Sequence, residues 1–161
     1  MLSNKNIIAV SSAGSRKTTF IVEEALATQN ERVLITTYTN ESIAQIKAYL
    51  TARAGCIPPN ITVQSWFSFL LQHGVRPYQP SMTNRKRIGT IDFTAVPQLY
   101  LQKADVDRYY LTSAGNILRD RVSDYICECH HRSSGMVINR LQQIYRKIFI
   151  DELQDLVGYD S

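Results

Sequence analysis

Four short runs of apolar residues, rich in Ile and Val, lack the spacing of a helix. Continuous apolar runs of this length are typical of strands that are buried on both faces of a parallel sheet. We therefore predict strands at residues 6–11, 32–37, 61–64 and 147–151.

Helical patterns lie between these runs. Residues 17–29 and 40–54 place apolar side chains three or four positions apart, and residues 66–73 follow the same spacing over a shorter stretch. Because strands alternate with helices along the chain, the pattern predicts an α/β fold with a mostly parallel sheet and right-handed crossovers.

Residues 74–135 interrupt this alternation. The segment opens with two prolines, continues through a basic run at residues 84–87 and has a helical pattern at residues 118–129. We interpret it as a small, largely helical insertion within a single domain that spans residues 1–161. Helical spacing returns at residues 136–146, just before the last predicted strand.

The composition narrows the class of protein. A chain of 161 residues is long enough for one domain with a sizeable core, and 44% hydrophobic with 20% charged residues excludes a disordered chain. No apolar run approaches the roughly 18 residues needed to cross a bilayer. Because the N-terminus also lacks the apolar core of a secretory signal, we expect a cytoplasmic protein. The net charge of +4 is compatible with a polyanionic partner.

A loop with the features of a phosphate-binding motif joins the first predicted strand to the first predicted helix. Strand, loop and helix in this order are the context of a Walker A motif, in which backbone N–H groups and the helix N-terminus bind phosphate oxygens. Lys17 would contact the β- and γ-phosphates, and the Thr18 hydroxyl would bind Mg²⁺. The residues expected around the phosphates are Ser12, Ala13, Gly14, Ser15, Arg16, Lys17, Thr18 and Thr19.

Two positions in this loop depart from the general pattern. Arg16 stands where a glycine normally precedes the lysine, and Ser11 stands at the first glycine position. Glycine serves where the backbone must approach a ligand closely, so an arginine should crowd the phosphates, although its guanidinium could pair with one of them. The alternative interpretation of the loop alone is an ordinary Gly-poor turn that starts a helix.

Paired carboxylates follow the last predicted strand. In P-loop ATPases the Asp at this position, here Asp151, holds Mg²⁺, and the adjacent Glu, here Glu152, polarises the attacking water as a general base. Both would lie at the C-terminal edge of a parallel sheet, where ligands bind in such folds. Taken alone, the segment could also be a buried strand that runs into an acidic surface turn. Together with the loop, it predicts a nucleotide-binding domain that uses ATP and Mg²⁺.

Residues 151–155 resemble a motif that is more specific than the acidic strand end of P-loop ATPases in general. Their sequence, Asp-Glu-Leu-Gln-Asp, resembles motif II of the UvrD/Rep-like superfamily 1 DNA helicases. The resemblance implies a RecA-like P-loop NTPase domain from an enzyme that couples ATP hydrolysis to movement along single-stranded DNA. It also implies that Gln154 couples the γ-phosphate to bound DNA and to a second motor domain, with Asp151, Glu152 and Lys17 as the other catalytic residues.

Two further segments are similar to DNA-contacting motifs of this family. Residues 36–40 (Thr-Thr-Tyr-Thr-Asn) are similar to motif Ia, and residues 62–66 (Thr-Val-Gln-Ser-Trp) stand where motif Ib would be. Tyr38 keeps an aromatic ring for stacking on a base, which contributes about 1–3 kcal/mol per base and tolerates any sequence. As alternatives, Tyr38 could be an ordinary strand-end aromatic and Trp66 a core residue. The resemblance implies contacts to single-stranded DNA from Tyr38, Thr39, Asn40, Ser65 and Trp66.

The chain also departs from the family. No glutamine precedes the first predicted strand, where the adenine-recognising Q motif would lie, and the chain ends ten residues after Asp151. By the resemblance, motifs III to VI and a second motor domain with an arginine finger would follow. We therefore expect a domain truncated after motif II, with an incomplete sheet, marginal stability and no ATP hydrolysis by this chain alone. Residues 74–135 occupy the place of the family's accessory helical subdomain.

Two other functions stay open on the sequence. One is a degenerate nucleic-acid-binding module without ATP turnover, an interpretation that Arg16 favours. The other is a P-loop phosphotransferase of an unrelated class, which would have no use for Tyr38 or Gln154. An ATPase domain should bind ATP-Mg²⁺, whereas the degenerate binding module should not. A helicase domain should bind single-stranded DNA through Tyr38, whereas an unrelated phosphotransferase should not.

Cysteine, histidine and basic clusters carry weaker signals. Cys127 and Cys129 alternate with other residues and precede two histidines, which does not match the usual Cys-x₂₋₄-Cys zinc spacing, and no second ligand pair follows. We interpret this segment as structural, and the odd count of three cysteines as reduced thiols. We interpret the basic residues 85–87 as a solvated loop, although such charges could contact DNA phosphates.

Overall fold

A parallel sheet forms the frame of the molecule. The structure is a computed structural model that describes residues 17–84, 87–98 and 100–153. The sheet has the order β2-β1-β5, with all pairs parallel. The predicted α/β class and parallel sheet are therefore confirmed, while the strand predicted at residues 6–11 lies outside the described residues. The three strands are β1 (Val33–Thr37), β2 (Ile61–Ser65) and β5 (Lys147–Ile150).

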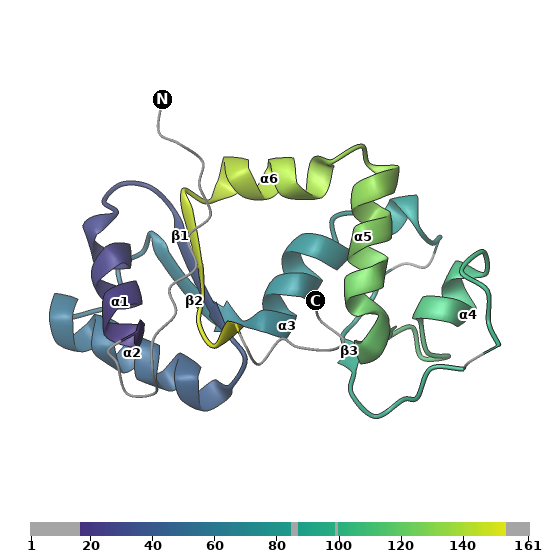
Figure 1. The fold of residues 1–161 in the computed structure, drawn as a ribbon, viewed down its shortest axis with the longest axis horizontal. Coiled ribbons are helices and arrows are strands. Elements are labelled where there is room, and N and C mark those ends of the chain that lie inside the picture. Colours follow the sequence, from purple (N-terminus) through teal and green to yellow (C-terminus); the bar gives the residue numbers. More distant parts are fainter. Residues whose placement is uncertain (1–16, 85–86, 99, 154–161) are drawn as a thin grey trace.

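Two helices cover one face of this sheet (Figure 1). They are α1 (Lys17–Ala27) and α2 (Asn40–Ala54), both at predicted positions. The Thr39 hydroxyl caps α2 by accepting a hydrogen bond from the Ser42 N–H, and Gly55 ends it with φ 77°, a left-handed conformation that favours glycine. Together they enclose an aliphatic core, here named the sheet core: Ile21, Val22, Ala25, Val33, Ile35, Ile46, Leu50 and Ile61.

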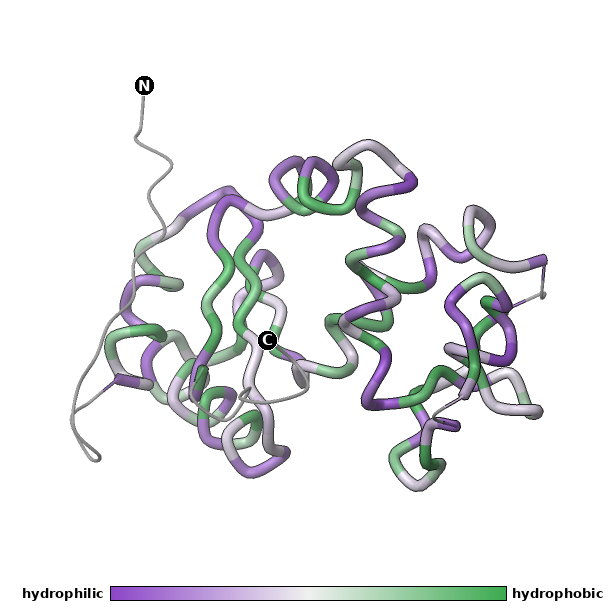
Figure 2. Tube along the Cα trace, turned by 45° about the vertical axis from the view of Figure 1, so that its right-hand side comes forward, coloured by the Kyte–Doolittle hydropathy of each residue, from purple (hydrophilic) through white to green (hydrophobic). Residues whose placement is uncertain are grey.

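Only the central strand is buried throughout. Every residue of β1 is buried, whereas β2 and β5 alternate with partly or largely exposed positions. Sequence reasoning predicted strands buried on both faces. Among the described strands of this sheet, β1 fits that prediction, whereas β2 and β5 do not. On β5, Ile148 and Ile150 are 36% and 37% exposed. Figure 2 shows hydrophobic residues concentrated along the strands of this sheet.

The other face of β1 contacts a second hydrophobic core. Leu34 points into this core, away from the sheet core. Its helices are α3 (Trp66–Phe69), the π-helical η1 (Leu70–Val75) that continues it, α5 (Val122–Arg132) and α6 (Met136–Ile144). The second core consists of Leu34, Phe69, Leu70, Leu71, Val75, Met82, Ile88, Ile91, Tyr110, Leu111, Ile117, Val122, Tyr125, Cys129 and Val137.

The helix predicted at residues 66–73 extends to Val75 and packs closely on α5. The Arg76 N–H donates to the Leu71 carbonyl five residues back, which widens the last turns to a π-helix. A Cβ at Gly74 would lie 2.5 Å from Cδ1 of Ile126 on α5. The absence of a side chain at Gly74 therefore permits the close approach of the two helices.

Residues 74–135 contain helices and a small sheet. The helix predicted at residues 118–129 is found as α5, preceded by the 3₁₀ turn η3 (Arg119–Arg121). Two-residue strands β3 (Ile91–Asp92) and β4 (Ile117–Leu118) pair in parallel, and they are too short to produce a recognisable alternation in the sequence. The segment also holds η2 (Gln79–Ser81) and α4 (Val106–Tyr110). Of the helices described, none has the length and apolar content needed to cross a bilayer.

Candidate functional site

The two residues predicted to bind Mg²⁺ lie side by side. The Thr18 hydroxyl donates a hydrogen bond of 3.3 Å to Oδ2 of Asp151, across 133 positions of sequence. Thr18 is in the first turn of α1, and Asp151 directly follows β5. The Asp151 N–H donates to the Thr36 carbonyl at 2.9 Å, which prolongs the pairing of β5 with β1. The fold thus brings the start of α1 and the end of β5 together at the C-terminal edge of the sheet.

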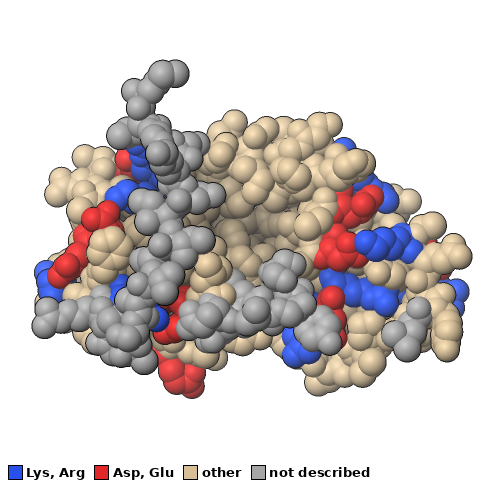
Figure 3. Space-filling model, viewed as in Figure 1, with Lys and Arg blue, Asp and Glu red and all other residues tan. Residues whose placement is uncertain are grey.

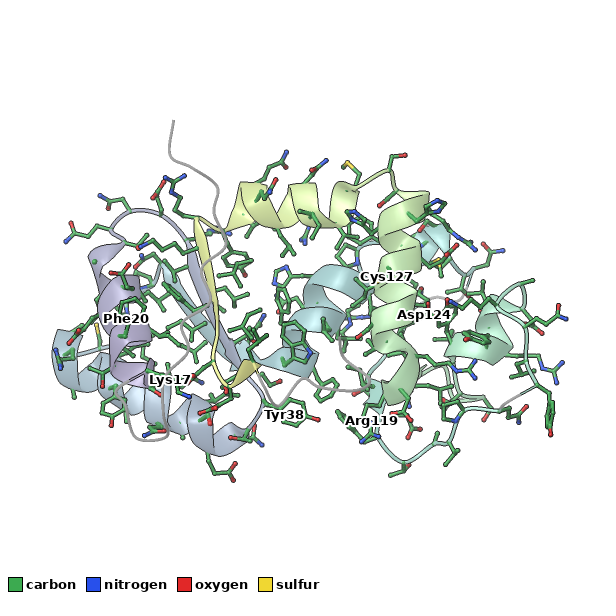
Figure 4. The ribbon with its side chains drawn as sticks, in the orientation of Figure 1. Lys17, Phe20, Tyr38, Arg119, Asp124 and Cys127 are labelled. Carbon is green, nitrogen blue, oxygen red and sulfur yellow. The ribbon has the colours of Figure 1, made fainter. Side chains whose placement is uncertain are left out.

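An ion pair holds these two elements together further along. The Lys147 ammonium, at the start of β5, lies 2.9 Å from a carboxylate oxygen of Glu24 in α1. Both side chains are about 40% exposed, so the pair fixes the orientation of the elements more than it contributes to stability. Lys17 lies at the other end of α1, beside the C-terminal end of β5 (Figure 4).

The Asp151 carboxylate is buried, and its surroundings disfavour its charged form. It is 5% exposed, and its pKa is raised above the ordinary value by desolvation and then by the neighbouring charge of Glu152. The hydrogen bond from Thr18, the N–H of Glu152 and the charge of Lys17 act in the opposite direction but are smaller effects. Because desolvation and the charge of Glu152 outweigh the stabilising contacts, a cation bound at Asp151 would stabilise its charged form.

Glu152 has an unusual backbone conformation. Its φ is 56°, in the left-handed region that residues with a side chain seldom adopt, and its N–H donates to Oδ1 of Asp151 at 3.1 Å. Such strained conformations cluster at functional sites, where the surrounding structure enforces them.

Thr37 is a site residue that sequence reasoning missed. Side chains alternate along β1, so Thr37 lies on the same face as Ile35, which contacts α1 and α2 in the sheet core. The register pairs Thr36 with Ile150, so the next positions, Thr37 and Asp151, are neighbours on adjacent strands. The Thr37 hydroxyl is buried, and among the described residues it has no hydrogen-bond partner. Buried hydroxyl groups normally have a hydrogen-bond partner, so this one marks a candidate ligand position. The sequence alone could not indicate it, because it does not show that β1 pairs with β5.

These oxygen ligands fit Mg²⁺. Mg²⁺ takes hydroxyl and carboxylate oxygens, and it is usually held by one or two protein ligands together with waters and substrate phosphates. Thr18 and Asp151 supply such a pair. In the part of the chain that the structure describes, no group of three or more His, Cys, Asp or Glu could hold a metal by itself.

The remaining predicted nucleotide-binding residues divide into two groups. Thr19 is partly buried in α1, where it lines a shallow hollow of about 380 Å³ with Phe20, Glu23 and Arg53. The others, Ser12, Ala13, Gly14, Ser15, Arg16 and Gln154, lie outside the described residues.

The predicted nucleic-acid residues have different surroundings. Thr39 and Ser65 are helix caps, since their hydroxyls accept hydrogen bonds from the N–H groups of Ser42 and Ser68. Asn40 is the first residue of α2 and is exposed. The start of a helix therefore explains the presence of these three residues, without a bound ligand.

Tyr38 and Trp66 differ from each other. The Tyr38 ring is partly exposed and lies 5.4 Å from the ring of Phe67, measured between centroids. Trp66 packs against the second core, 5.3 Å from Phe69, and its indole N–H is buried without a partner. Tyr38 is thus available to a ligand, whereas the position of Trp66 is that of a core residue.

The cysteine and histidine segment lies on α5. Cys129 is buried in the second core, where desolvation raises the pKa of its thiol to about 12, while Cys127 is exposed. The helix therefore points the two thiols into different environments. Both are free, as is Cys56.

No protein-family model matches the chain, and the comparisons with curated proteins and with solved structures likewise find nothing similar to it.

Proposed function

We propose that this chain is the N-terminal, RecA-like ATP-binding domain of a UvrD/Rep-like DNA helicase, which uses ATP and Mg²⁺ and acts on single-stranded DNA. The observation that carries the proposal is the hydrogen bond between Thr18 and Asp151. It joins the start of the helix after the predicted phosphate loop to the end of the acidic strand.

Each residue has a role that its position supports. Thr18 and Asp151 would bind Mg²⁺ through oxygen, and Lys17 would bind the phosphates from the same edge of the sheet. Bound Mg²⁺ neutralises phosphate charge as it develops. Glu152, which directly follows Asp151 in a left-handed backbone conformation, would orient the attacking water as general base. Thr37 adds a buried hydroxyl that can accept a hydrogen bond from a metal-bound water or donate one to a phosphate oxygen.

The nucleic-acid part of the proposal rests on Tyr38. It directly follows β1, the strand that also pairs with the acidic strand β5. A base stacked on its ring would therefore lie one strand away from the Mg²⁺ ligands. By the resemblance, hydrolysis needs a second motor domain, so the decisive measurement is binding rather than turnover.

Titration with a fluorescent ATP analogue in the presence of Mg²⁺ tests the nucleotide site. Thr18→Val should weaken binding by roughly tenfold or more, and Thr18→Ser, which keeps the hydroxyl, should retain most of it. Asp151→Asn should abolish the Mg²⁺ dependence. Because it removes a buried charge, it should leave the nucleotide-free protein at least as stable as the unaltered chain. Equal affinity of Thr18→Val and Thr18→Ser would contradict the proposed metal site.

The second candidate function is a nucleic-acid-binding module without ATP turnover. Arg16, at the position of the glycine before Lys17, is the observation that favours it. If ATP-Mg²⁺ does not bind and Arg16→Gly does not restore binding while single-stranded DNA still binds, this second function replaces the first.

A further inference from the structure

Three aromatic rings form a connected row from the sheet edge to the second core. Tyr38 follows β1, Phe67 is the second residue of α3, and Phe93 follows β3. The centroid of Phe67 lies 5.4 Å from that of Tyr38, with a tilt of 58°, and 4.8 Å from that of Phe93, edge to face at 89°. We name Tyr38, Phe67 and Phe93 the aromatic row. The row connects Tyr38, for which the family resemblance implies DNA contact, to Phe93, for which it implies no contact.

Burial alone does not explain why Phe93 is there. Its side chain is 53% exposed, and it is not part of either core. Single exposed aromatics are normal at protein surfaces, and Tyr100, 97% exposed, is one of them here. Phe93 differs because it continues a line of rings in contact, which presents aromatic surface to solvent at a point where the chain could have carried a polar residue.

A cation follows the strand that pairs with the segment before Phe93. Strands β3 and β4 pair Asp92 with Leu118, and Phe93 and Arg119 are the residues that directly follow this last pair. Figure 4 shows Tyr38 and Arg119 along the same edge of the molecule. The Arg119 guanidinium pairs with Asp120 at 2.8 Å, with side chains 40% and 25% exposed. A pair at the surface of this kind contributes little to stability, so a phosphate can compete for the guanidinium.

Charges of both signs accompany Arg119 on this face. Figure 3 shows basic and acidic residues together on the α5 side, next to an uncharged area in the upper middle of the face. A generally basic surface would bind any polyanion, including duplex DNA, through phosphates alone. Exposed rings next to a local cation instead suit a ligand with accessible base faces, which a duplex hides.

We propose that the aromatic row and Arg119 form a binding surface for single-stranded nucleic acid that extends from Tyr38 onto the segment after β3. Bases would stack on Tyr38 and Phe93, with Phe67 supporting both rings, and Arg119 would pair with a backbone phosphate. The inference rests on the proposed function, because it continues the path of a strand that starts at Tyr38. It assigns to Phe93 a role that neither its burial nor the family resemblance supplies.

Fluorescence anisotropy with a labelled oligothymidylate and the full chain tests this surface. Phe93→Ala should weaken binding by roughly tenfold, the loss of one stacked base. Phe93→Leu keeps a bulky apolar side chain without a ring and should weaken binding to a similar extent, whereas Phe93→Trp should retain it. The matched control is Tyr100→Ala, which removes an exposed aromatic outside the row and should bind like the unaltered chain.

The arginine is tested through the salt dependence. Arg119→Gln should weaken binding at low salt and reduce the slope of log affinity against log salt by about 0.7, the value for one phosphate contact to a single strand. Arg108→Gln is the control, because Arg108 is 71% exposed on α4 and pairs with Asp105. An unchanged slope for Arg119→Gln would remove Arg119 from the surface.

The outcomes separate the inference from the proposed function. If Tyr38→Ala weakens binding but Phe93→Ala and Phe93→Leu do not, the extension onto the second segment is wrong and the proposed function stands. If none of the three weakens binding, the nucleic-acid part of the proposed function fails as well. Equal affinity for a duplex of the same length would contradict stacking on the row. Circular dichroism melting of each variant identifies loss of binding that results from unfolding.

Discussion

The two hydrophobic cores are built from different chemistry. The sheet core contains only Ile, Val, Leu and Ala, so it buries no side-chain polar atom of its own. The second core includes tyrosines, a cysteine and a methionine, and it packs against the buried His73. An aliphatic core leaves the polar chemistry to the strand ends, where Asp151 and Thr37 lie. A core with polar side chains must find them hydrogen-bond partners or lose stability.

The second core satisfies its polar groups unevenly. The Tyr110 hydroxyl donates to Asp124 at 3.2 Å, whereas the Tyr125 hydroxyl is buried without a partner. His73 is satisfied on both nitrogens. Since Arg140 can only donate, Nδ1 of His73 accepts from it at 3.3 Å, which leaves the proton on Nε2 to be donated to the Tyr145 hydroxyl at 3.2 Å. The second core is therefore the region where pH and single hydroxyl groups should affect stability.

A matched pair of isoleucines tests whether the two cores unfold together. Ile46→Ala in the sheet core and Ile117→Ala in the second core, both fully buried, should each lower the free energy of unfolding by about 2–5 kcal/mol. Because β1 contributes to both cores, each substitution should shift one shared transition in urea. Two separate transitions, each shifted by only one substitution, would show that the cores are independent.

Thr37 tests the chemistry at the edge of the sheet core. Thr37→Val removes the hydroxyl and keeps the shape, so it should weaken Mg²⁺-nucleotide binding by roughly tenfold, the contribution of one hydrogen bond to a charged group. The control is Thr36→Val, whose hydroxyl is also buried without a partner but lies on the opposite face of β1. Both variants should stabilise the nucleotide-free protein. Equal loss of binding in both would assign no specific role to Thr37.

Two tyrosines test the second core at the level of single hydroxyl groups. Tyr110→Phe should destabilise by about 1–2 kcal/mol, because it breaks a hydrogen bond to a carboxylate. Tyr125→Phe should be neutral or stabilising by up to about 1 kcal/mol, because it removes a buried hydroxyl without a partner. Chemical denaturation measures both. Destabilisation of the same size in both variants would contradict the difference between the two hydroxyl groups.

His73 should make stability depend on pH. Desolvation and then the charge of Arg140 lower its pKa below the ordinary 6.5. Below pH 6.5 the unfolded state therefore takes up the proton before the folded state does, so stability should be full above that pH and should fall as the pH decreases. The pH dependence of the thermal midpoint checks this. His73→Gln should flatten the profile, and an unchanged profile in this variant would contradict the role of His73.

The sequence by itself determined the local elements. The apolar runs at residues 32–37, 61–64 and 147–151 became strands of a parallel sheet, and the 3.6-residue spacing located α1, α2 and α6, because both patterns depend only on near neighbours. The candidate metal ligands Thr18 and Asp151 were also found from sequence, since strand-loop-helix order restricts where a phosphate loop and an acidic strand end can lie.

The tertiary structure decided which distant residues meet. The order β2-β1-β5 made Thr37 a neighbour of Asp151, and no local pattern records which strands pair. The two-residue strands β3 and β4 exist because each pairs with the other, and their pairing brings together the segments that directly precede Phe93 and Arg119. Packing also separated Trp66, which lies partly buried against the second core, from Tyr38, which is partly exposed beside Phe67. Periodicity is a property of adjacent positions, whereas these contacts join residues far apart in the chain, so only the folded molecule contains them.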